Sequence, residues 1–498
     1  MSLEHVDVLI VGAGLSGICA GYHVQDKCPE KSFAILEARD SISGTWDLFR
    51  YPGVRSDSDM YTLGFRFRPW PDAKAIADGP SIRNYVRETA SDYGIDRKIR
   101  FHHRVVGAEW SSEDERWTVE AVRGDTGETV RLTCGFLFFC SGYYRYDEGY
   151  TPDFAGIERF GGGIVHPQRW PEDVDYDGKR VVVIGSGATA VTLVPALAER
   201  AAHVTMLQRS PSYVVSLPWE DPVASALRRF LPARLVYSIV RWKNVLLTML
   251  SFELSRRRPR IAKALVRKGV ERRLPPGYDI DTHFRPRYNP WDQRLCLVPD
   301  GDLFDAICDG RASVVTDEVE TFTETGLRLA SGDELEADLI VTATGFNLVM
   351  LGGATLSVDG EEVKLPDKLT YKGLMLSGVP NMAIAVGYTN ASWTLKCELT
   401  CEYVCRLLGY MDERGYAVCT PRNRDPGITR EPLIDFSSGY VQRSIEQFPR
   451  QGPRPPWRLH QNYARDIFLL RLGPIEDEAL EFTGAPTRAA EPEERVAA

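Results

Sequence analysis

The chain contains no Cys-x-x-Cys pair, no apolar run of eighteen or more residues and no excess of basic residues. Its ten cysteines therefore favour a reducing, cytoplasmic compartment over a disulfide framework. Without a long apolar run we expect no transmembrane helix. The opening residues, MSLEHV, lack the charged and apolar segments of a secretory leader. The net charge of −9 argues against nucleic-acid binding as the main task.

Three of the cysteines, Cys397, Cys401 and Cys405, are spaced by four residues, so that they share one face of a predicted helix. A metal site is conceivable there. However, no histidine or fourth thiol follows at ligand spacing, which favours a buried helix stripe. We expect no metal site.

A glycine-rich segment near the N-terminus has the context of a dinucleotide-binding loop. The apolar strand predicted at 6–11 runs into Gly12-x-Gly14-x-x-Gly17, and a helix is predicted at 18–25. The next apolar strand ends in Glu37, twenty residues after Gly17. This order of strand, loop, helix, strand and acid is typical of a Rossmann unit.

Each residue type suits a dinucleotide. Gly12 permits the tight turn, Gly14 lets the backbone approach a pyrophosphate, and Gly17 lets the helix pack on the strand. Ser16 lies in the first helical turn, whose free N–H groups favour phosphate. Glu37 would accept hydrogen bonds from the ribose hydroxyls of the adenosine half.

A second unit follows at residues 180–210. The apolar strand at 180–184 leads into Gly185-x-Gly187-x-x-Ala190, and the next strand ends in Gln208-Arg209-Ser210. Arg209 thus stands where Glu37 stands in the first unit. An arginine there would bind a 2′-phosphate, with the Ser210 hydroxyl beside it, whereas an acid would repel it. The first site is therefore interpreted as an FAD site and the second as an NADPH site. The alternative for Arg209 is a solvated surface arginine.

The fold class predicted is α/β, with two Rossmann-like dinucleotide-binding domains and a helical insertion. Arg228 to Arg273 contains fourteen Lys or Arg residues and two acids, Glu253 and Glu271. Packing of these basic helices on the nucleotide domains is favoured, and peripheral membrane contact is the alternative. The predicted boundaries are 1–145 and 379–483 for the FAD domain, 146–215 and 290–378 for the NADPH domain, 216–289 for the insertion and 484–498 for a disordered tail.

The stretch between the two units, residues 160–171 (FGGGIVHPQRWP), has the sequence character of a glycine-rich loop joining two domains. It fits F-x-G-x-x-x-H-x-x-x-W-P, with His166 and Trp170 at the defining positions. Between two Rossmann loops, this pattern resembles the fingerprint of the Baeyer–Villiger monooxygenases, which are class B flavoprotein monooxygenases. The related N/S-oxygenases carry Tyr or Phe in place of the Trp. The segments GTWDLFRYPG, RSDSDMYTLGFRFRPW and YNPWDQRLCLVP resemble family members that also S-oxygenate thioamides.

The resemblance implies an FAD-containing enzyme that uses NADPH and O₂ to convert ketones into esters or lactones through a C4a-peroxyflavin. It also implies oxygenation of sulfides or thioamides. Arg294 corresponds to the family's active-site arginine and Asp57 to the carboxylate that holds it. Many members have Lys before that arginine, serving the 2′-phosphate, whereas this chain has Gln293, so that more of the NADPH preference would rest on Arg209.

The resemblance also assigns the cofactor contacts. FAD would be contacted by Ser16, Glu37, Thr45, Trp46, Asp47, Leu48, Asp57 and Val105. NADPH would be contacted by Gly185, Ser186, Gly187, Ala188, Thr189, Ala190, Val191, Arg209 and Ser210, with Arg55, Ser56 and Asp57 reaching toward its nicotinamide.

Three alternatives remain. A flavin disulfide reductase would share both glycine loops, but residues 40–60 contain no cysteine for a redox pair. A non-enzymatic flavoprotein at a membrane surface could use the basic helices without needing Arg209 or Arg294. A flavin-containing N/S-monooxygenase without ketone activity is the closest alternative within the monooxygenases.

Overall fold

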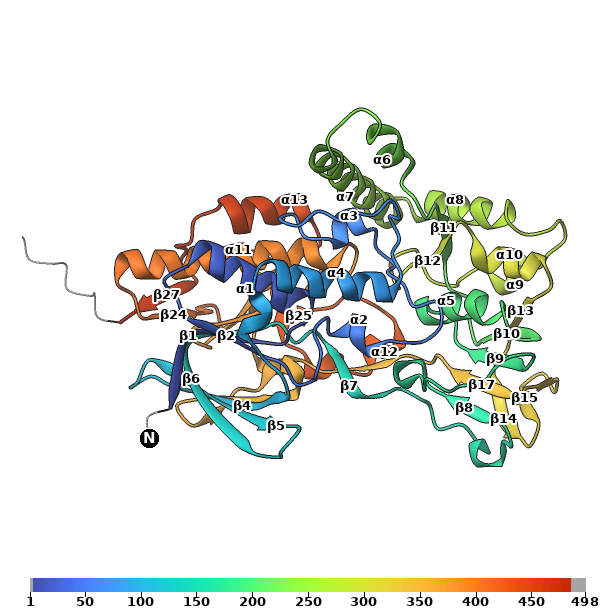
Figure 1. Cartoon of the computed structure of the whole chain (residues 1–498), viewed down its shortest axis with the longest axis horizontal. Coiled ribbons are helices and arrows are strands. Elements are labelled where there is room, and N and C mark those ends of the chain that lie inside the picture. Colours follow the sequence, from blue (N-terminus) through green and yellow to red (C-terminus); the bar gives the residue numbers. More distant parts are fainter. Residues whose placement is uncertain (1–2, 485–498) are drawn as a thin grey trace, which may run out of the picture.

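The computed structural model describes residues 3–484 and has an α/β architecture built on two separate sheets (Figure 1). In the first sheet β1 is the central strand, with β2 and β6 as parallel neighbours. The last residues of β1 are buried, because helices cover one face of the sheet and other strands lie on the other. The strand order of this sheet is β20-β19-β4-β5-β6-β1-β2-β3, with β23 also pairing with β6. The strands are β1 (Glu4–Val11), β2 (Phe33–Leu36), β3 (Ile99–Arg100), β4 (His103–Ser111), β5 (Arg116–Arg123), β6 (Thr129–Phe139), β19 (Thr355–Val358), β20 (Glu361–Glu362) and β23 (Met382–Ile384).

Long helices pack over the first sheet. The glycine loop after β1 leads into α1, which packs on the long helix α11. The three thiols of α11 are buried on this side, where Cys397 Sγ lies 3.1 Å from Ser16 Oγ. The helices of this layer are α1 (Leu15–Lys27), α4 (Gly79–Asp92) and α11 (Trp393–Arg414).

The second sheet is parallel throughout, in the order β13-β10-β9-β17-β8. Helices α5 and α10 pack together beside it, and α5 follows the second glycine loop. The elements are β8 (Gly163–Val165), β9 (Arg180–Ile184), α5 (Ala188–Leu197), β10 (His203–Gln208), α10 (Asp302–Cys308), β13 (Ala312–Thr316) and β17 (Leu339–Thr342), with a small antiparallel sheet of β14 (Val319–Thr323), β15 (Gly326–Leu329) and β16 (Glu334–Glu336). The predicted fold class is confirmed: two dinucleotide-binding units and an insertion.

The joint at residues 160–171 is not the loop that its glycines predicted. It forms the edge strand β8, which pairs with β17 from Gly163 to Val165, and then one turn of 3₁₀ helix at Pro167–Arg169. A strand of three residues is too short to show an alternating pattern, and its partner β17 lies far along the chain. His166 packs against Gly149 so tightly that a Cβ there would lie 1.9 Å from the ring. Its Nε2 lies 3.2 Å from the carbonyl oxygen of Gly345.

An antiparallel ribbon of β7 (Tyr144–Gly149) and β18 (Phe346–Leu348) connects the two sheets. Strand β19 pairs with β4 of the first sheet, although the predicted boundary assigns residues 290–378 to the second domain. Local patterns do not reveal this pairing, because β19 and β4 are distant in sequence. The remaining boundaries stay predictions. Of the predicted tail, only Gly484 lies within the described residues.

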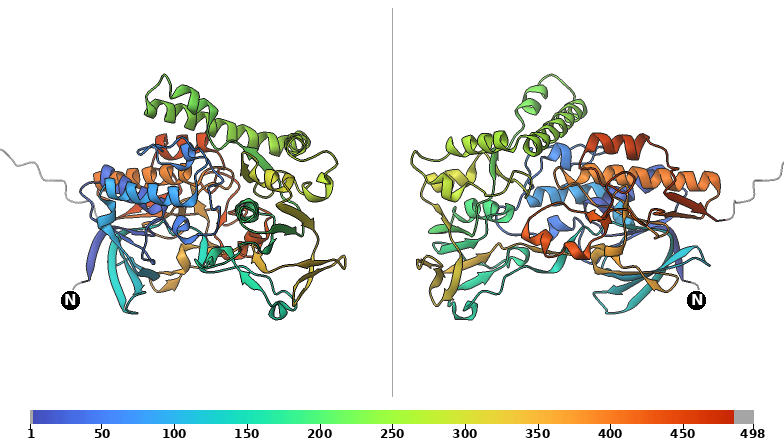
Figure 2. Two further views of the ribbon diagram at one scale, coloured as in Figure 1. Left: turned by 45° about the vertical axis from the view of Figure 1, so that its right-hand side comes forward. Right: turned by 180° about the vertical axis from the view of Figure 1, so that it is seen from behind.

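The insertion leaves the second unit at β11 (Val214–Leu217), which pairs with β12 (Cys296–Pro299) on the return. It consists of α6 (Pro222–Leu227), α7 (Ala233–Arg257), α8 (Pro259–Glu271) and α9 (Ile280–His283). Helices α7 and α8 run along the outer edge of the molecule (Figure 2). Within residues 3–484, no helix combines the length and apolarity needed to cross a bilayer.

Shorter elements complete the chain. They are α2 (Thr45–Leu48), α3 (Met60–Leu63), α12 (Gly439–Gln442), α13 (Tyr463–Asp466), a π-helix at Ile467–Leu472, β21 (Thr370–Tyr371), β22 (Met375–Leu376), β24 (Val418–Pro421), β25 (Glu431–Pro432), β26 (Arg450–Gln451), β27 (Leu480–Thr483) and further 3₁₀ turns at Ile95–Lys98, Ile157–Arg159, Leu351–Gly353, Leu365–Asp367 and Ile445–Gln447.

Candidate functional site

One cleft of about 1360 Å³ opens where the carboxyl ends of the strands in both sheets meet. Ligands of open α/β sheets bind at this edge. The cleft exceeds the roughly 300–1,000 Å³ typical of small-ligand sites, as expected if it holds two dinucleotides. Both glycine loops line it, and so do the ends of β2 and β10.

The first glycine loop is fixed by close backbone contacts. A Cβ on Gly17 would lie 1.8 Å from the carbonyl oxygen of Gly12, so only glycine lets α1 approach the loop. Gly12 itself has φ +101°, a conformation that favours glycine. Gly12, Gly14 and Ser16 therefore line the cleft, while Gly17 packs behind them. The Ser16 hydroxyl accepts a hydrogen bond of 2.9 Å from Trp393 Nε1, which ties the loop to α11.

Glu37 lies at the end of β2 with its carboxylate held by the backbone. Oε2 accepts a 2.7 Å hydrogen bond from the Ala13 N–H, and Oε1 accepts one of 2.9 Å from Arg39. The side chain is buried, and burial raises the pKa of its carboxyl group. Each oxygen retains a second lone pair that a ribose hydroxyl can reach.

The other residues predicted to contact FAD separate into two groups. Thr45, Trp46, Leu48 and Val105 line the cleft. Asp47 is not on the cleft wall: it is 1% exposed and surrounded by arginines, with Arg39 Nη2 at 2.5 Å and Arg50 Nη2 at 3.0 Å. This placement differs from the prediction of a direct contact. Within a one-turn helix, successive side chains point in different directions.

The second glycine loop also opens onto the cleft. Gly185, Ser186, Gly187, Ala188 and Thr189 line it, whereas Ala190 and Val191 are buried inside α5 and do not reach the wall. Ser186 Oγ donates a 2.9 Å hydrogen bond to the Ser210 carbonyl, which ties the loop to the end of β10. Arg209 and Ser210 are exposed at the rim of the cleft.

Arg294 and Asp57 meet at the centre of the cleft. Arg294 Nε lies 3.0 Å from Asp57 Oδ2, and both side chains are about a third exposed. The charge of Asp57 holds the pKa of the Arg294 guanidinium above its usual value, against the opposing effect of burial. The cation is therefore permanent and its position is set by the carboxylate.

The neighbours of this pair have different roles. Arg55 lines the cleft, but its guanidinium forms an ion pair with Asp302 and lies over the Trp219 ring. Ser56 is buried and its hydroxyl accepts a 3.0 Å hydrogen bond from the Ser58 N–H. Gln293 lines the cleft beside Arg294.

Sequence reasoning missed a group of tyrosines around Arg294. Tyr143, Tyr144 and Tyr440 line the cleft and contribute to the electrostatic environment of the Arg294 guanidinium. Burial raises the pKa of Tyr144 and of Tyr440, so both rings stay neutral at physiological pH. The run Tyr143-Tyr144-Arg145-Tyr146 follows the end of β6, and this is the signal that could have identified two of these residues, Tyr143 and Tyr144.

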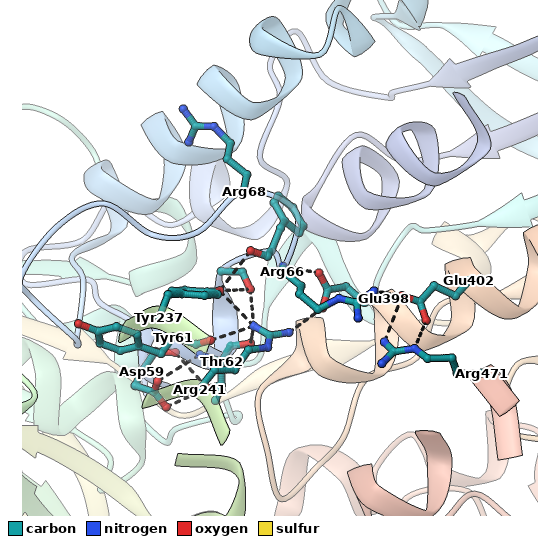
Figure 3. A network of polar contacts seen from close by, with 12 residues as sticks. Asp59, Tyr61, Thr62, Arg66, Arg68, Tyr237, Arg241, Glu398, Glu402 and Arg471 are labelled. Atoms are coloured by element: carbon teal, nitrogen blue, oxygen red, sulfur yellow. Dashed lines mark hydrogen bonds and ion pairs between the residues drawn. The ribbon is translucent and has the colours of Figure 1, made fainter. Parts of the chain in front are cut away.

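A buried polar network fixes the insertion to the wall of the cleft (Figure 3). Arg241 of α7 is 4% exposed, and its Nη2 lies 2.6 Å from Glu398 Oε2 of α11. Its Nη1 donates 2.8 Å hydrogen bonds to the carbonyls of Tyr61 and Gly64. These residues follow Asp57 closely in sequence. The network therefore holds α7, α11 and the segment behind the Arg294–Asp57 pair as one unit.

Two dinucleotide sites facing one cleft, with an arginine–aspartate pair between them, define a two-cofactor flavoprotein. A profile described as flavin-binding monooxygenase-like matches residues 70–376, and an NAD(P)-binding Rossmann-like domain matches residues 10–78. The chain belongs to the flavin-binding monooxygenase-like family, which confirms the family assignment made from its motifs. It is a flavin-dependent monooxygenase, and its cofactors are FAD and NADPH.

Curated relatives align over nearly the whole chain. The FAD-containing monooxygenase EthA of Mycobacterium tuberculosis is 59% identical over 484 residues, which covers 97% of this chain and 99% of the relative. The putative FAD-containing monooxygenase MymA of the same species is 54% identical, covering 97% and 98%. The resemblance carried by residues 44–53, 55–70 and 288–299, which is specifically to the ethionamide-activating monooxygenase, is confirmed.

Solved structures agree on the fold. An oxidized steroid monooxygenase bound to NADP superimposes with a TM-score of 0.70 at 24% identity, covering 84% of this chain and 88% of that one. An open crystal structure of cyclohexanone monooxygenase gives a TM-score of 0.70 at 20% identity, with 84% and 90% covered.

Proposed function

We propose that this enzyme is a Baeyer–Villiger monooxygenase that converts ketones into esters or lactones and also oxygenates sulfides or thioamides at sulfur. The observation that carries the proposal is the Arg294–Asp57 ion pair, which lies in the cleft between the two dinucleotide units. The overall reaction consumes a ketone, O₂, NADPH and a proton, and it yields an ester, NADP⁺ and water.

When bound, reduced FAD activates O₂ and supplies the oxygen atom that is inserted. The residues of this chain orient the partners and stabilise charge. Arg294 donates N–H groups to the negative charge that develops on the carbonyl oxygen of the ketone. Asp57 fixes the guanidinium, so that little reorganisation is needed when that charge forms.

The cofactor contacts in this proposal follow the cleft wall. FAD is contacted by Gly12, Gly14, Ser16, Glu37, Thr45, Trp46, Leu48 and Val105. NADPH is contacted by Gly185 to Thr189, Arg209 and Ser210, and its nicotinamide end is flanked by Arg55, Ser56 and Asp57. Four of the predicted contact residues lie behind the cleft wall and act through the residues that line it: Gly17, Asp47, Ala190 and Val191. Gly17 and the two α5 residues shape the loops, and Asp47 anchors arginines of the wall.

The alternative is a flavin-containing N/S-monooxygenase without ketone activity. Trp170 in the fingerprint favours the Baeyer–Villiger reaction. Its ring lies at the joint, 6.4 Å from that of Tyr176, where it would influence the coupling of the two units and not the chemistry itself.

A substrate screen with a matched variant tests the proposal. Holoenzyme is incubated with NADPH, O₂ and aliphatic ketones, aryl ketones, sulfides or thioamides, and products are identified by mass spectrometry. We expect esters from wild type, and none from Arg294→Ala, which should still bind FAD and accept hydride. Arg97→Ala serves as the control, because Arg97 is exposed and does not line the cleft. Sulfoxides without any ester from wild type would establish the alternative, and normal ester yield from Arg294→Ala would refute the role of Arg294.

A further inference from the structure

One side of α7 exposes a continuous row of large apolar side chains. Leu235, Ile239, Trp242, Leu246 and Leu250 recur at helical spacing and are between 40% and 66% exposed. The opposite side of the same helix is buried against the FAD domain through Val236, Tyr237, Val240 and Arg241. The exposed row is therefore not the core face of the helix. Exposed apolar areas of this kind on a folded chain mark interaction sites.

The row continues onto neighbouring elements. On α8, Ile261 and Leu265 are 51% and 58% exposed, and Lys268 and Arg272 follow at the same helical spacing. The π-helix exposes Phe468 and Leu472 at 69% and 64%. The Trp242 ring lies 5.8 Å from Tyr463, just before the π-helix, and both views in Figure 2 show these helices along one edge. We call the seven apolar residues of α7 and α8 the docking face: Leu235, Ile239, Trp242, Leu246, Leu250, Ile261 and Leu265.

The charge around the docking face is opposite in sign to that of the chain. The whole chain carries −9, whereas residues 228–273 contain fourteen basic residues and two acids. Both acids are neutralised locally, Glu253 by Arg257 at 2.5 Å and Glu271 by Arg267 at 2.7 Å. Among the ion pairs of the described residues, none involves Arg229, Arg234, Arg258, Arg260, Lys263, Lys268, Arg272 or Arg273, so their charges are available to a partner.

We propose that the docking face binds the surface of an anionic lipid bilayer, with α7 and α8 lying in the plane of the interface. Apolar side chains enter the boundary between headgroups and acyl chains, and the surrounding Lys and Arg residues bind anionic headgroups. Trp242 suits this boundary, because its ring is apolar and its N–H is polar. A second copy of the chain is a poorer occupant, since two such faces would bring like charges together.

The arrangement also explains why the face can be exposed without weakening the fold. Helix α7 is anchored from its other side by the buried Arg241–Glu398 pair. Further along the helix, Phe252 contacts the Trp291 ring at 5.6 Å, and Arg256 Nη1 lies 3.0 Å from Asp292 Oδ1. Residues 291 and 292 lie immediately before Gln293 and Arg294. Helix α7 would therefore separate the bilayer from the cleft. Binding itself does not require the proposed ketone reaction, so the two proposals can fail separately.

Vesicle flotation of the FAD-loaded full chain tests the proposal. Liposomes of phosphatidylcholine alone are compared with liposomes containing 30% phosphatidylglycerol, at low and at high salt. We expect flotation with the anionic vesicles, at least a tenfold weaker interaction with the neutral ones, and partial release at high salt. Equal binding to both vesicle types, or no binding to either, would overturn the proposal.

Two variants and two matched controls separate the contributions. Leu246→Asn/Leu250→Asn removes apolar area, and Arg260→Gln/Lys268→Gln/Arg272→Gln removes three charges from α8. Each should lower vesicle affinity at least tenfold while FAD content and thermal stability stay at wild-type values. The controls are Ile164→Asn, an exposed apolar residue on β8, and Arg97→Gln/Arg311→Gln/Arg328→Gln, with the same loss of charge elsewhere. Controls that reduce binding as much as the variants would refute the docking face. So would sedimentation showing that Leu246→Asn/Leu250→Asn converts an oligomer into a monomer without affecting vesicle binding.

Discussion

Arg294 and Asp57 are far apart in the sequence, yet Arg294 Nε lies 3.0 Å from Asp57 Oδ2. Asp57 belongs to the loop between α2 and α3 of the first unit, and Arg294 to the return from the insertion into β12. The pair therefore forms only when the two cofactor units and the insertion have packed together. One edge of the guanidinium faces the carboxylate, which leaves its other N–H groups free to point toward a bound substrate.

The first prediction concerns Asp57. In Asp57→Ala the Arg294 guanidinium stays charged but loses its orientation, so we expect kcat for ester formation to fall roughly tenfold to a hundredfold, corresponding to about 1–3 kcal/mol. Stopped-flow measurement of flavin reduction, together with steady-state turnover, would separate the reductive step from oxygenation. Asp147→Ala removes another carboxylate of the cleft wall and should have little effect. If both variants lose the same activity, Asp57 has no specific role.

The second prediction concerns the coenzyme. Arg209→Ala should raise KM for NADPH more than KM for NADH, because only NADPH loses charge-assisted hydrogen bonds to its 2′-phosphate. The binding free energy lost would be about 1–3 kcal/mol. Conversely, Gln293→Lys adds a cation on the cleft wall and should increase the preference for NADPH. The ratio of kcat/KM for the two coenzymes measures both effects. A ratio unchanged in both variants would show that neither position faces the 2′-phosphate.

The third prediction concerns the first glycine loop. A methyl group on Gly17 would lie 1.8 Å from the Gly12 carbonyl oxygen, which the backbone cannot accommodate without moving α1. We expect Gly17→Ala to be purified with little or no FAD, as judged by the flavin absorbance. Gly187→Ala is the matched substitution in the second loop, where a Cβ meets no atom within 4 Å, and it should retain FAD. Normal flavin content in Gly17→Ala would mean that the loop is more adaptable than its contacts indicate.

The fourth prediction concerns pH. His23 is buried in α1, where burial lowers its pKa to about 4, against a value near 6.5 when exposed. The surrounding charges are Glu402, Lys27, Arg66 and Asp26. Because the unfolded chain binds the proton more tightly, the contribution of neutral His23 to stability is complete above about pH 6.5. Stability is lost as the pH falls from about 6.5 toward 4, and at pH 5 the loss relative to pH 8 amounts to about 2 kcal/mol.

Thermal unfolding of wild type and His23→Leu at pH 8 and pH 5 measures this effect. The variant should show a smaller loss of Tm on acidification than wild type does. An identical loss in both proteins would assign the acid sensitivity to other groups.

The sequence was sufficient for the parts of the site that depend on local geometry. Each glycine loop follows the first strand of a short βαβ segment, and Glu37 or Arg209 follows the second strand. The FAD and NADPH that these residues predicted are confirmed. The fingerprint around His166 and Trp170 predicted the family, which is also confirmed.

The remaining features depend on long-range packing. No local pattern shows that Asp47 turns away from the cleft into an arginine cluster, or that Ala190 and Val191 are buried within α5. Strand β8 exists because β17, far along the chain, supplies its partner. The buried Arg241–Glu398 pair could not be predicted either, because the basic composition of the insertion favoured packing on the nucleotide domains without indicating which arginine is buried or which acid it meets.

That buried pair carries the last prediction (Figure 3). The side chains of Arg241 and Glu398 are 5% and 1% exposed, so removing one leaves an uncompensated charge in the interior. Arg241→Met and Glu398→Leu should each destabilise the protein by about 3–5 kcal/mol, and the double variant by less than their sum. Arg257→Met breaks the exposed Arg257–Glu253 pair on the same helix and should lower the free energy of unfolding by less than about 1 kcal/mol.

Thermal unfolding followed by tryptophan fluorescence, with FAD release recorded in parallel, gives the four values of this double-mutant cycle. Because Arg241 also donates to the carbonyls of Tyr61 and Gly64, Arg241→Met should loosen the segment behind Asp57 and release FAD at a lower temperature than Glu398→Leu does. Strict additivity of the two single variants would show that the charges do not act as a pair. Equal effects of Arg241→Met and Arg257→Met would show that burial of the cation is not what makes it important.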